Sequence, residues 1–244
     1  MLTYFLAFYL LVVLPVLPLL GLRRTTGDVL PSALMRRYGL RGVEVLILLA
    51  VLWIACVQAG HTPAQIGLAF PSPGAGMWWL GFSLLLVMSL YLADNVLARR
   101  QTPEARAEFA RNLLDSPVPW PQTGKQTLAF ALSAALITAA WEILYRGFIL
   151  LLLTPTTGLP IAILASSIAY GVAHGYQNPK KLISSIFSAL AFTIAYALTH
   201  SLWWLIVIHA AVPLMALPAV SRARGKRESE FAKAPMEPVQ VDKQ

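Results

Sequence analysis

The chain has 244 residues, of which 57% are hydrophobic and only 12% are charged, and its mean hydropathy is +0.65. Soluble domains carry roughly 25% charged residues, so this composition indicates a membrane protein. The net charge is +8, but Lys and Arg lie in short stretches between apolar runs, a distribution typical of a topology signal rather than of a nucleic-acid partner. The single cysteine, Cys56, excludes an intrachain disulfide and a thiolate metal cluster.

Seven continuous apolar runs predict an all-α bundle of about seven transmembrane helices. Most of them have the roughly 20 residues that cross about 30 Å of hydrocarbon. The first run is followed, not preceded, by Arg23 and Arg24, which is the reverse of a cleavable signal peptide, so we expect it to remain as a span. The runs are 2–22, 43–60, 77–98, 126–153, 159–175, 183–199 and 202–219.

Basic residues alternate between the loops. The first, third and fifth loops and the tail contain Lys and Arg, whereas the second, fourth and sixth loops contain none. The positive-inside rule therefore predicts an external N-terminus and a cytoplasmic C-terminus. We expect a multi-pass protein of the plasma (inner) membrane.

The runs divide the chain into three parts. A three-span region with a cytoplasmic loop covers 1–112, a four-span core covers 113–220, and a polar tail without periodicity, 221–244, is predicted to be disordered. Within the cytoplasmic loop, Thr102-Pro103-Glu104 has the cap, proline and acid of a helix start and predicts a short interfacial helix.

The later spans contain four ionisable side chains, Glu142, Arg146, His174 and His209. Charged groups at membrane depth are costly and usually mark a functional site or an internal ion pair. If the fourth and fifth spans form a hairpin around Thr156, the depths of Glu142 and His174 differ by about 6 Å. By the same count, His209 lies shallower by roughly 8–14 Å, so a re-entrant or offset seventh span is needed to bring it level.

Two histidines and a carboxylate are the ligand types of a catalytic zinc ion, which lowers the pKa of a bound water. The spacing is equally compatible with histidines that hydrogen-bond to neighbouring helices. It is also compatible with a self-neutralising ion pair between Glu142 and Arg146. The residues alone leave these alternatives open.

Residues from about 113 to 220 resemble the core of the CPBP family, the CAAX proteases and bacteriocin-processing enzymes. That family has the ordered motifs Glu-Glu-x-x-x-Arg, Phe-x-x-x-His and His-x-x-x-Asn/Asp. The corresponding segments here are Trp141–Arg146, Tyr170–His174 and His209–Pro213. The resemblance implies an intramembrane zinc endopeptidase, with Glu142 and Arg146 as catalytic residues and His174, His209 and Glu142 as metal ligands.

The chain departs from the family pattern at two positions. Trp141 replaces the first glutamate, which activates the metal-bound water in the family, and Pro213 replaces the Asn or Asp after the last histidine. Tryptophan accepts no proton, and proline offers no side-chain ligand. Adjacent helical residues point about 100° apart, so Glu142 does not take the place of residue 141 by default.

Three functions remain in view from the sequence. The first is a zinc-dependent endopeptidase acting on membrane-embedded or membrane-associated proteins or peptides, with the lipid bilayer as its surroundings and no nucleic-acid partner. The second is a catalytically impaired relative that binds a membrane partner or confers immunity, as Trp141 and Pro213 indicate. The third is a transport or proton-relay site, although no internal repeat is visible.

Overall fold

A computed structural model describes residues 1–20, 33–71, 73–115, 118–174 and 178–233. Within these ranges the regular elements are helices and there is no strand, which confirms the all-α prediction. The elements are α1 (Leu2–Phe8), η1 (Tyr9–Val13), α2 (Leu14–Leu19), α3 (Leu34–Ala59), α4 (Ala75–Arg100), α5 (Pro103–Leu114), α6 (Gly124–Glu142), η3 (Ile143–Ile149), α7 (Leu150–Thr157), α8 (Leu159–Ala173), α9 (Pro179–Thr199) and α10 (Trp203–Lys233).

Six helical stretches in the described chain are long and apolar enough to cross a membrane, and α8 is a shorter apolar helix. The protein is therefore a multi-pass integral membrane protein. At 15 residues, α8 covers only about 22 Å, less than the hydrocarbon thickness. It packs against α7, α9 and α2, so neighbouring helices shield it. The six longer stretches are Leu2–Leu19, Leu34–Ala59, Ala75–Arg100, Gly124–Thr157, Pro179–Thr199 and Trp203–Gly225.

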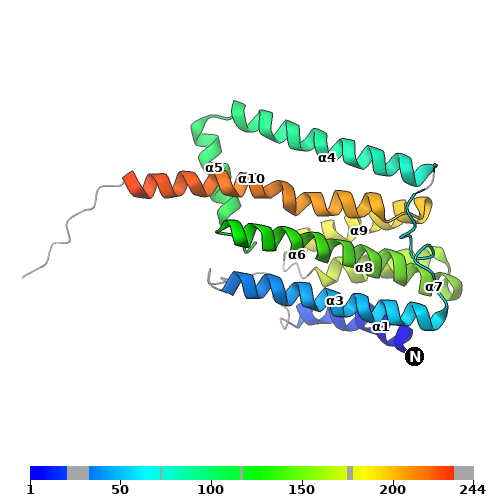
Figure 1. The fold of residues 1–244 in the computed structure, drawn as a ribbon. Coiled ribbons are helices and arrows are strands. Elements are labelled where there is room, and N and C mark those ends of the chain that lie inside the picture. The colour runs from blue at the N-terminus through cyan, green and yellow to red at the C-terminus, as the bar shows by residue number, and fades with distance from the viewer. Residues whose placement is uncertain (21–32, 72, 116–117, 175–177, 234–244) are drawn as a thin grey trace, which may run out of the picture.

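The helices form an elongated bundle in which α6, η3, α8 and α10 lie centrally (Figure 1). At one edge, α4 packs against α10, and α10 in turn packs against α6. On the other side, α6 packs against α3, and α8 contacts η1 and α2. The central helices are those that carry the four ionisable residues, so the fold brings them to the middle of the bundle.

The predicted hairpin between the fourth and fifth spans is present. The fourth span runs through α6, η3 and α7, and it ends at Gly158, whose φ of 79° lies in the left-handed region that glycine tolerates. α8 then begins at Leu159 and packs against α7 and η3, whereas α6 packs against α3 and α10.

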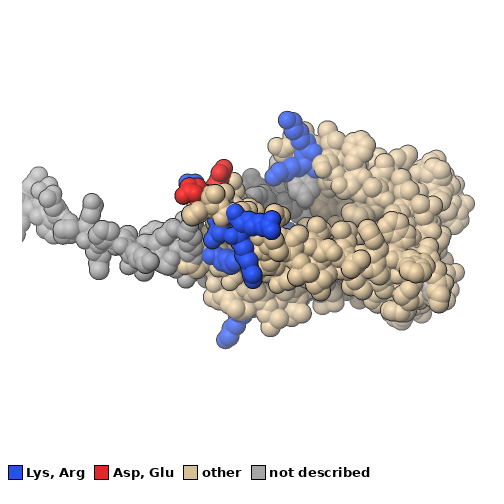
Figure 2. Space-filling model, turned by 90° about the horizontal axis from the view of Figure 1, so that it is seen from above, with Lys and Arg blue, Asp and Glu red and all other residues tan. Residues whose placement is uncertain are grey.

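The Lys and Arg side chains lie toward the end of the bundle from which α10 projects (Figure 2), and the opposite end is free of described Lys and Arg in this view. This segregation agrees with the alternating loop charges. Which end faces the cytoplasm stays a prediction. Arg23 and Arg24 lie outside the described residues.

The loop after α3 covers the turn between α9 and α10. The Leu202 N–H donates to the Gly67 carbonyl at 3.0 Å, and the Trp203 indole N–H donates to the Ala69 carbonyl at 3.1 Å. Leu202 is fully buried. The loop therefore holds the start of α10 through backbone and indole hydrogen bonds, while His200 at the turn is exposed.

Two predictions about the cytoplasmic segments have different outcomes. The predicted short helix is present as α5, where the Thr102 hydroxyl accepts from the Ala105 N–H at 3.3 Å, and its position at the membrane interface stays a prediction. The structure continues α10 as a helix through residues 221–233, where we predicted disorder. The rest of the predicted tail, 234–244, lies outside the described residues.

Candidate functional site

The charged pair of the fourth span is completely buried. Glu142 and Arg146 are each 0% exposed, and Arg146 Nη1 donates to Glu142 Oε1 at 2.7 Å. An ion pair held four residues apart neutralises two charges that would each be costly at membrane depth. This part of the sequence-based interpretation is confirmed by the contact.

The helix widens at this pair. α6 ends at Glu142, and the following π-helical segment η3 contains Tyr145, Arg146 and Gly147. A Cβ on Gly147 would lie 2.7 Å from the Ile66 carbonyl oxygen, so only glycine lets the loop that contains Ile66 approach here. Single π turns within α-helices are frequent at functional sites. The sequence analysis did not predict this segment.

Tyr145 ties the widened helix to its neighbours. Its carbonyl accepts from the Ser166 hydroxyl at 2.8 Å, and its own hydroxyl donates to the Leu10 carbonyl at 2.8 Å. In η1 the Leu14 N–H donates to the carbonyl of Tyr9, five residues earlier. The same pattern would pair the Leu10 carbonyl with the N–H of residue 15, but Pro15 has no N–H. Tyr145 thus satisfies a backbone carbonyl that the bilayer would leave without a partner.

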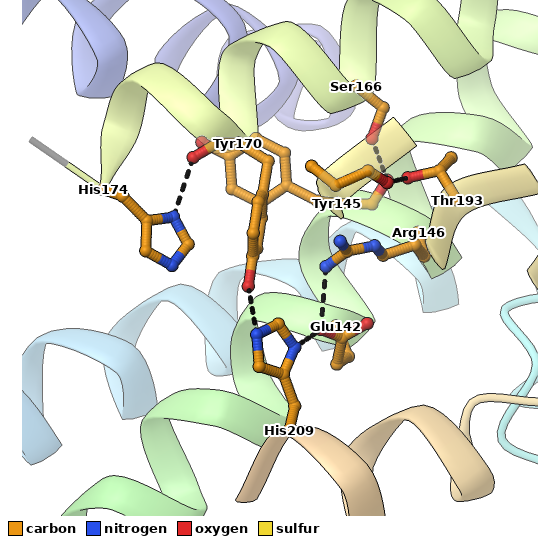
Figure 3. Close-up of polar contacts among 9 residues, drawn as sticks. Glu142, Tyr145, Arg146, Ser166, Tyr170, His174, Thr193 and His209 are labelled. Carbon is orange, nitrogen blue, oxygen red and sulfur yellow. Dashed lines mark hydrogen bonds and ion pairs between the residues drawn. The ribbon is translucent and has the colours of Figure 1, made fainter. Parts of the chain in front are cut away.

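His209 reaches the buried carboxylate from α10. Its Nδ1 lies 2.5 Å from Glu142 Oε1, with Arg146 on the same oxygen (Figure 3). The expectation that His209 lies 8–14 Å shallower is therefore wrong. The offset of the seventh span that this estimate required is therefore present, and the Leu202 N–H holds the start of α10 on the Gly67 carbonyl.

Tyr170 connects the two histidines. Its hydroxyl lies 3.3 Å from His209 Nε2, and its carbonyl lies 3.0 Å from Nδ1 of His174 on the next turn of α8. The Arg146 guanidinium carbon stands 4.0 Å from the centre of the Tyr170 ring, a cation–π distance. The sequence analysis treated Tyr170 only as a variant of the motif phenylalanine. Its hydroxyl was the sequence feature that could have indicated this role, since a phenylalanine cannot make the contact with His209.

Trp141 lies beside the histidine of α8. Its ring stacks on Tyr145 with centroids 5.3 Å apart and planes 13° apart. The same ring lies 5.6 Å from the His174 ring and meets Tyr170 edge to face at 5.6 Å. Trp141 therefore forms an aromatic wall of the site. Its ring packs against the side chains that a carboxylate at this position would contact.

Two cavities meet at these residues. The first, of about 520 Å³, opens between α8 and α9 and extends from Arg146 to Lys180 and Lys181. The second, of about 490 Å³, lies among α3, α6, α8 and α10 and extends from Trp141 and Pro213 to Arg37 and Arg41. Both are lined by Tyr170, His174 and His209.

Residues 123–215 match the family model described as type II CAAX prenyl endopeptidase Rce1-like. The resemblance to the CPBP family is confirmed for this core. No curated protein and no solved structure matches the chain. The family match indicates a CAAX-type intramembrane protease, and the site described above lies within the Rce1-like core.

Buried polar atoms remain without partners in the Rce1-like core. Glu142 Oε2 and both Nε and Nη2 of Arg146 are buried and make no hydrogen bond to the described residues. Arg146 also lines the first cavity, so a ligand in that cavity would lie next to this residue. A buried donor without a hydrogen bond is costly in free energy, so such atoms usually bind a substrate, an ion or a water molecule.

The side chains of the Rce1-like core do not form a zinc ligand set in this arrangement. In the described part of the chain, no group of three or more His, Cys, Asp or Glu side chains is placed to hold a metal ion. Glu142 and His209 bind each other, whereas His174 joins them only through Tyr170. The donor types suit zinc, but the ligands would have to exchange their present partners for the metal.

Proposed function

We propose that this protein is an intramembrane endopeptidase that cleaves peptide bonds of membrane-embedded or membrane-associated proteins or peptides. The observation that carries the proposal is the contact between the buried Glu142 and His209, a residue of the Rce1-like core that lines two cavities. Cavities on both sides of one histidine provide room for a chain segment before and after the bond that is cut.

In this proposal His209 is the general base. A carboxylate only accepts, so the proton between Glu142 and His209 is assigned to Nδ1, and Nε2 is the acceptor. In the present arrangement the Tyr170 hydroxyl lies 3.3 Å from Nε2, so this hydroxyl must give way to the attacking water. Nε2 takes a proton from a water molecule as that water's oxygen bonds to the peptide carbonyl carbon. The C–N bond then breaks, and Nε2–H returns the proton to the leaving nitrogen.

Glu142 and Arg146 have supporting roles in the same step. Glu142 is a positioning residue, since it fixes the His209 ring and stabilises the imidazolium that forms. Arg146 holds Glu142 through Nη1, and its unpartnered Nε and Nη2 are donors for the negative charge that develops on the carbonyl oxygen. A preformed donor in a dry site stabilises this charge more than water does.

The zinc ion expected from the sequence stays a prediction. The ligands implied by the resemblance were Glu142, His174 and His209, whose present contacts do not form a ligand set. No step above is assigned to a metal. Metal analysis of the purified protein tests this prediction separately from peptidase activity.

The test uses purified full-length protein in lipid vesicles, zinc in the buffer and a fluorogenic peptide that ends in a prenylated CAAX sequence. We expect cleavage, a loss of at least about 10²-fold in kcat for His209→Ala, and no change for the loop variant His61→Ala. Glu142→Gln should lower kcat more than it raises KM, because a positioning residue acts through His209. Undiminished cleavage by His209→Ala would refute the assignment of the base.

A second candidate function rests on Trp141. This ring covers His174 with an aromatic surface in place of the carboxylate of the family motif, which favours a site that binds a membrane peptide without cutting it. No cleavage by folded wild-type protein, together with crosslinking of the same peptide that Trp141→Ala abolishes, would favour this candidate. Cleavage by the wild type would reject it.

A further inference from the structure

A third cavity lies outside the candidate site, at the end of the bundle where the basic residues gather. It has a volume of about 390 Å³ and opens among the last turns of α4, the interfacial helix α5 and the distal part of α10. Three arginines line it, one from each helix: Arg99, Arg106 and Arg222. We call it the arginine pocket.

The arginine pocket carries an excess of positive charge. Three arginines against the one acid in its lining, Asp94, leave two uncompensated positive charges. The acid is only loosely engaged, since Arg222 Nη2 stands 3.5 Å from Asp94 Oδ2 and both side chains are about half exposed. Arg106 donates to the Gln101 carbonyl at 2.9 Å, which keeps its guanidinium at the pocket.

The rest of the lining is mostly apolar and lies next to exposed apolar surface of α4. Besides the polar Asn95 and Gln101, Phe109 and four alanines complete the pocket wall. α4 packs against α10, but its other faces expose large apolar side chains such as Leu85, Leu92 and Leu97. A molecule with a charged head in the pocket therefore has a hydrophobic surface beside it for aliphatic chains.

We propose that the arginine pocket binds the phosphate group of an anionic membrane phospholipid whose acyl chains lie along α4. Guanidinium groups bind phosphate oxygens in a bidentate manner, and three of them converge here from separate helices. Basic pockets between transmembrane helices near the membrane surface are recognised sites for anionic headgroups. The charge excess favours a headgroup without a compensating cation, such as phosphatidylglycerol, over the zwitterionic phosphatidylcholine. The proposal is independent of peptidase activity.

The test measures lipid binding to the full-length protein in a neutral detergent. Phosphatidylglycerol, phosphatidylcholine and inorganic phosphate are added separately, and binding is followed by the rise in Tm and by native mass spectrometry. We expect phosphatidylglycerol to raise Tm and to be retained, and the other two to have little effect. An equal rise in Tm with inorganic phosphate would overturn the lipid assignment.

Two variants with the same change in charge separate the arginine pocket from general electrostatic attraction. Arg99→Gln/Arg106→Gln removes two pocket arginines, and Arg100→Gln/Arg111→Gln removes two arginines of the same helices that do not line the pocket. At about fivefold per arginine, we expect the first variant to bind phosphatidylglycerol about 25-fold more weakly. The control should bind almost as the wild type does. Equal losses in both variants would refute a specific site.

Discussion

The buried ion pair makes a strong prediction about stability. Glu142→Gln keeps the shape of the side chain but removes the negative charge, so Arg146 stays fully buried without its counter-ion. Removal of one partner of a buried pair costs about 3–5 kcal/mol, which raises the unfolding equilibrium constant by roughly two to nearly four powers of ten. The His209 contact with the carboxylate is weakened in the same variant.

The chain contains a matched control for this change. Arg41 and Glu44 also form an ion pair within one helix, at 2.7 Å, but their side chains are 35% and 28% exposed. Glu44→Gln should therefore lower the free energy of unfolding by no more than about 1 kcal/mol. The two pairs share the substitution and the starting distance. They differ in burial and in the additional contact of Glu142 with His209.

The assay is reversible unfolding in mixed micelles with increasing denaturing detergent, followed by tryptophan fluorescence. A double-mutant cycle with Arg146→Met adds the second test, since removal of both charges should recover much of the loss. A cost for Glu142→Gln no greater than that for Glu44→Gln would refute the reasoning. So would strict additivity of the two single substitutions at positions 142 and 146.

Three further predictions concern packing, the metal and the aromatic wall. Gly171→Ala should lower the free energy of unfolding by about 1–3 kcal/mol, because the added Cβ would lie 2.6 Å from a side-chain carbon and 2.9 Å from the Cα of Ile186. Gly81→Ala, with open space around its Cβ, should not lower it in the same unfolding assay. The zinc prediction requires that elemental analysis find about one equivalent of zinc and that His174→Ala remove it; binding would also require His174 and His209 to exchange their present contacts for the metal, and zinc-free wild-type protein would refute the prediction. Trp141→Glu places a carboxylate where the family motif has its first glutamate. Because His209 already supplies the base in the proposed mechanism, the rate of peptide cleavage should change by less than about tenfold, and a rise of about 10²–10⁴-fold would refute the assignment of His209 as the base.

The sequence by itself determined the membrane architecture. Apolar runs of about 20 residues have no stable alternative to helix in a bilayer, because every backbone polar group needs an internal partner. The i,i+4 spacing of Glu142 and Arg146 likewise fixes their mutual reach on any helix, and the structure contains that pair. The Thr102 cap and the turn near Thr156 are also local effects, which is why a few residues were enough to place both.

Only the tertiary structure decided how the site is assembled. The depth of His209 depends on a loop more than 130 residues away in sequence that covers the start of α10, and a count of residues along one helix cannot include that loop. The widened turn at Gly147 depends on the approach of Ile66, and the role of Tyr170 depends on a histidine from another helix. These are contacts between distant segments, set by packing rather than by local propensity. The sequence identified the ionisable residues. Packing determined that Glu142 contacts Arg146 and His209 and that Tyr170 lies between the two histidines.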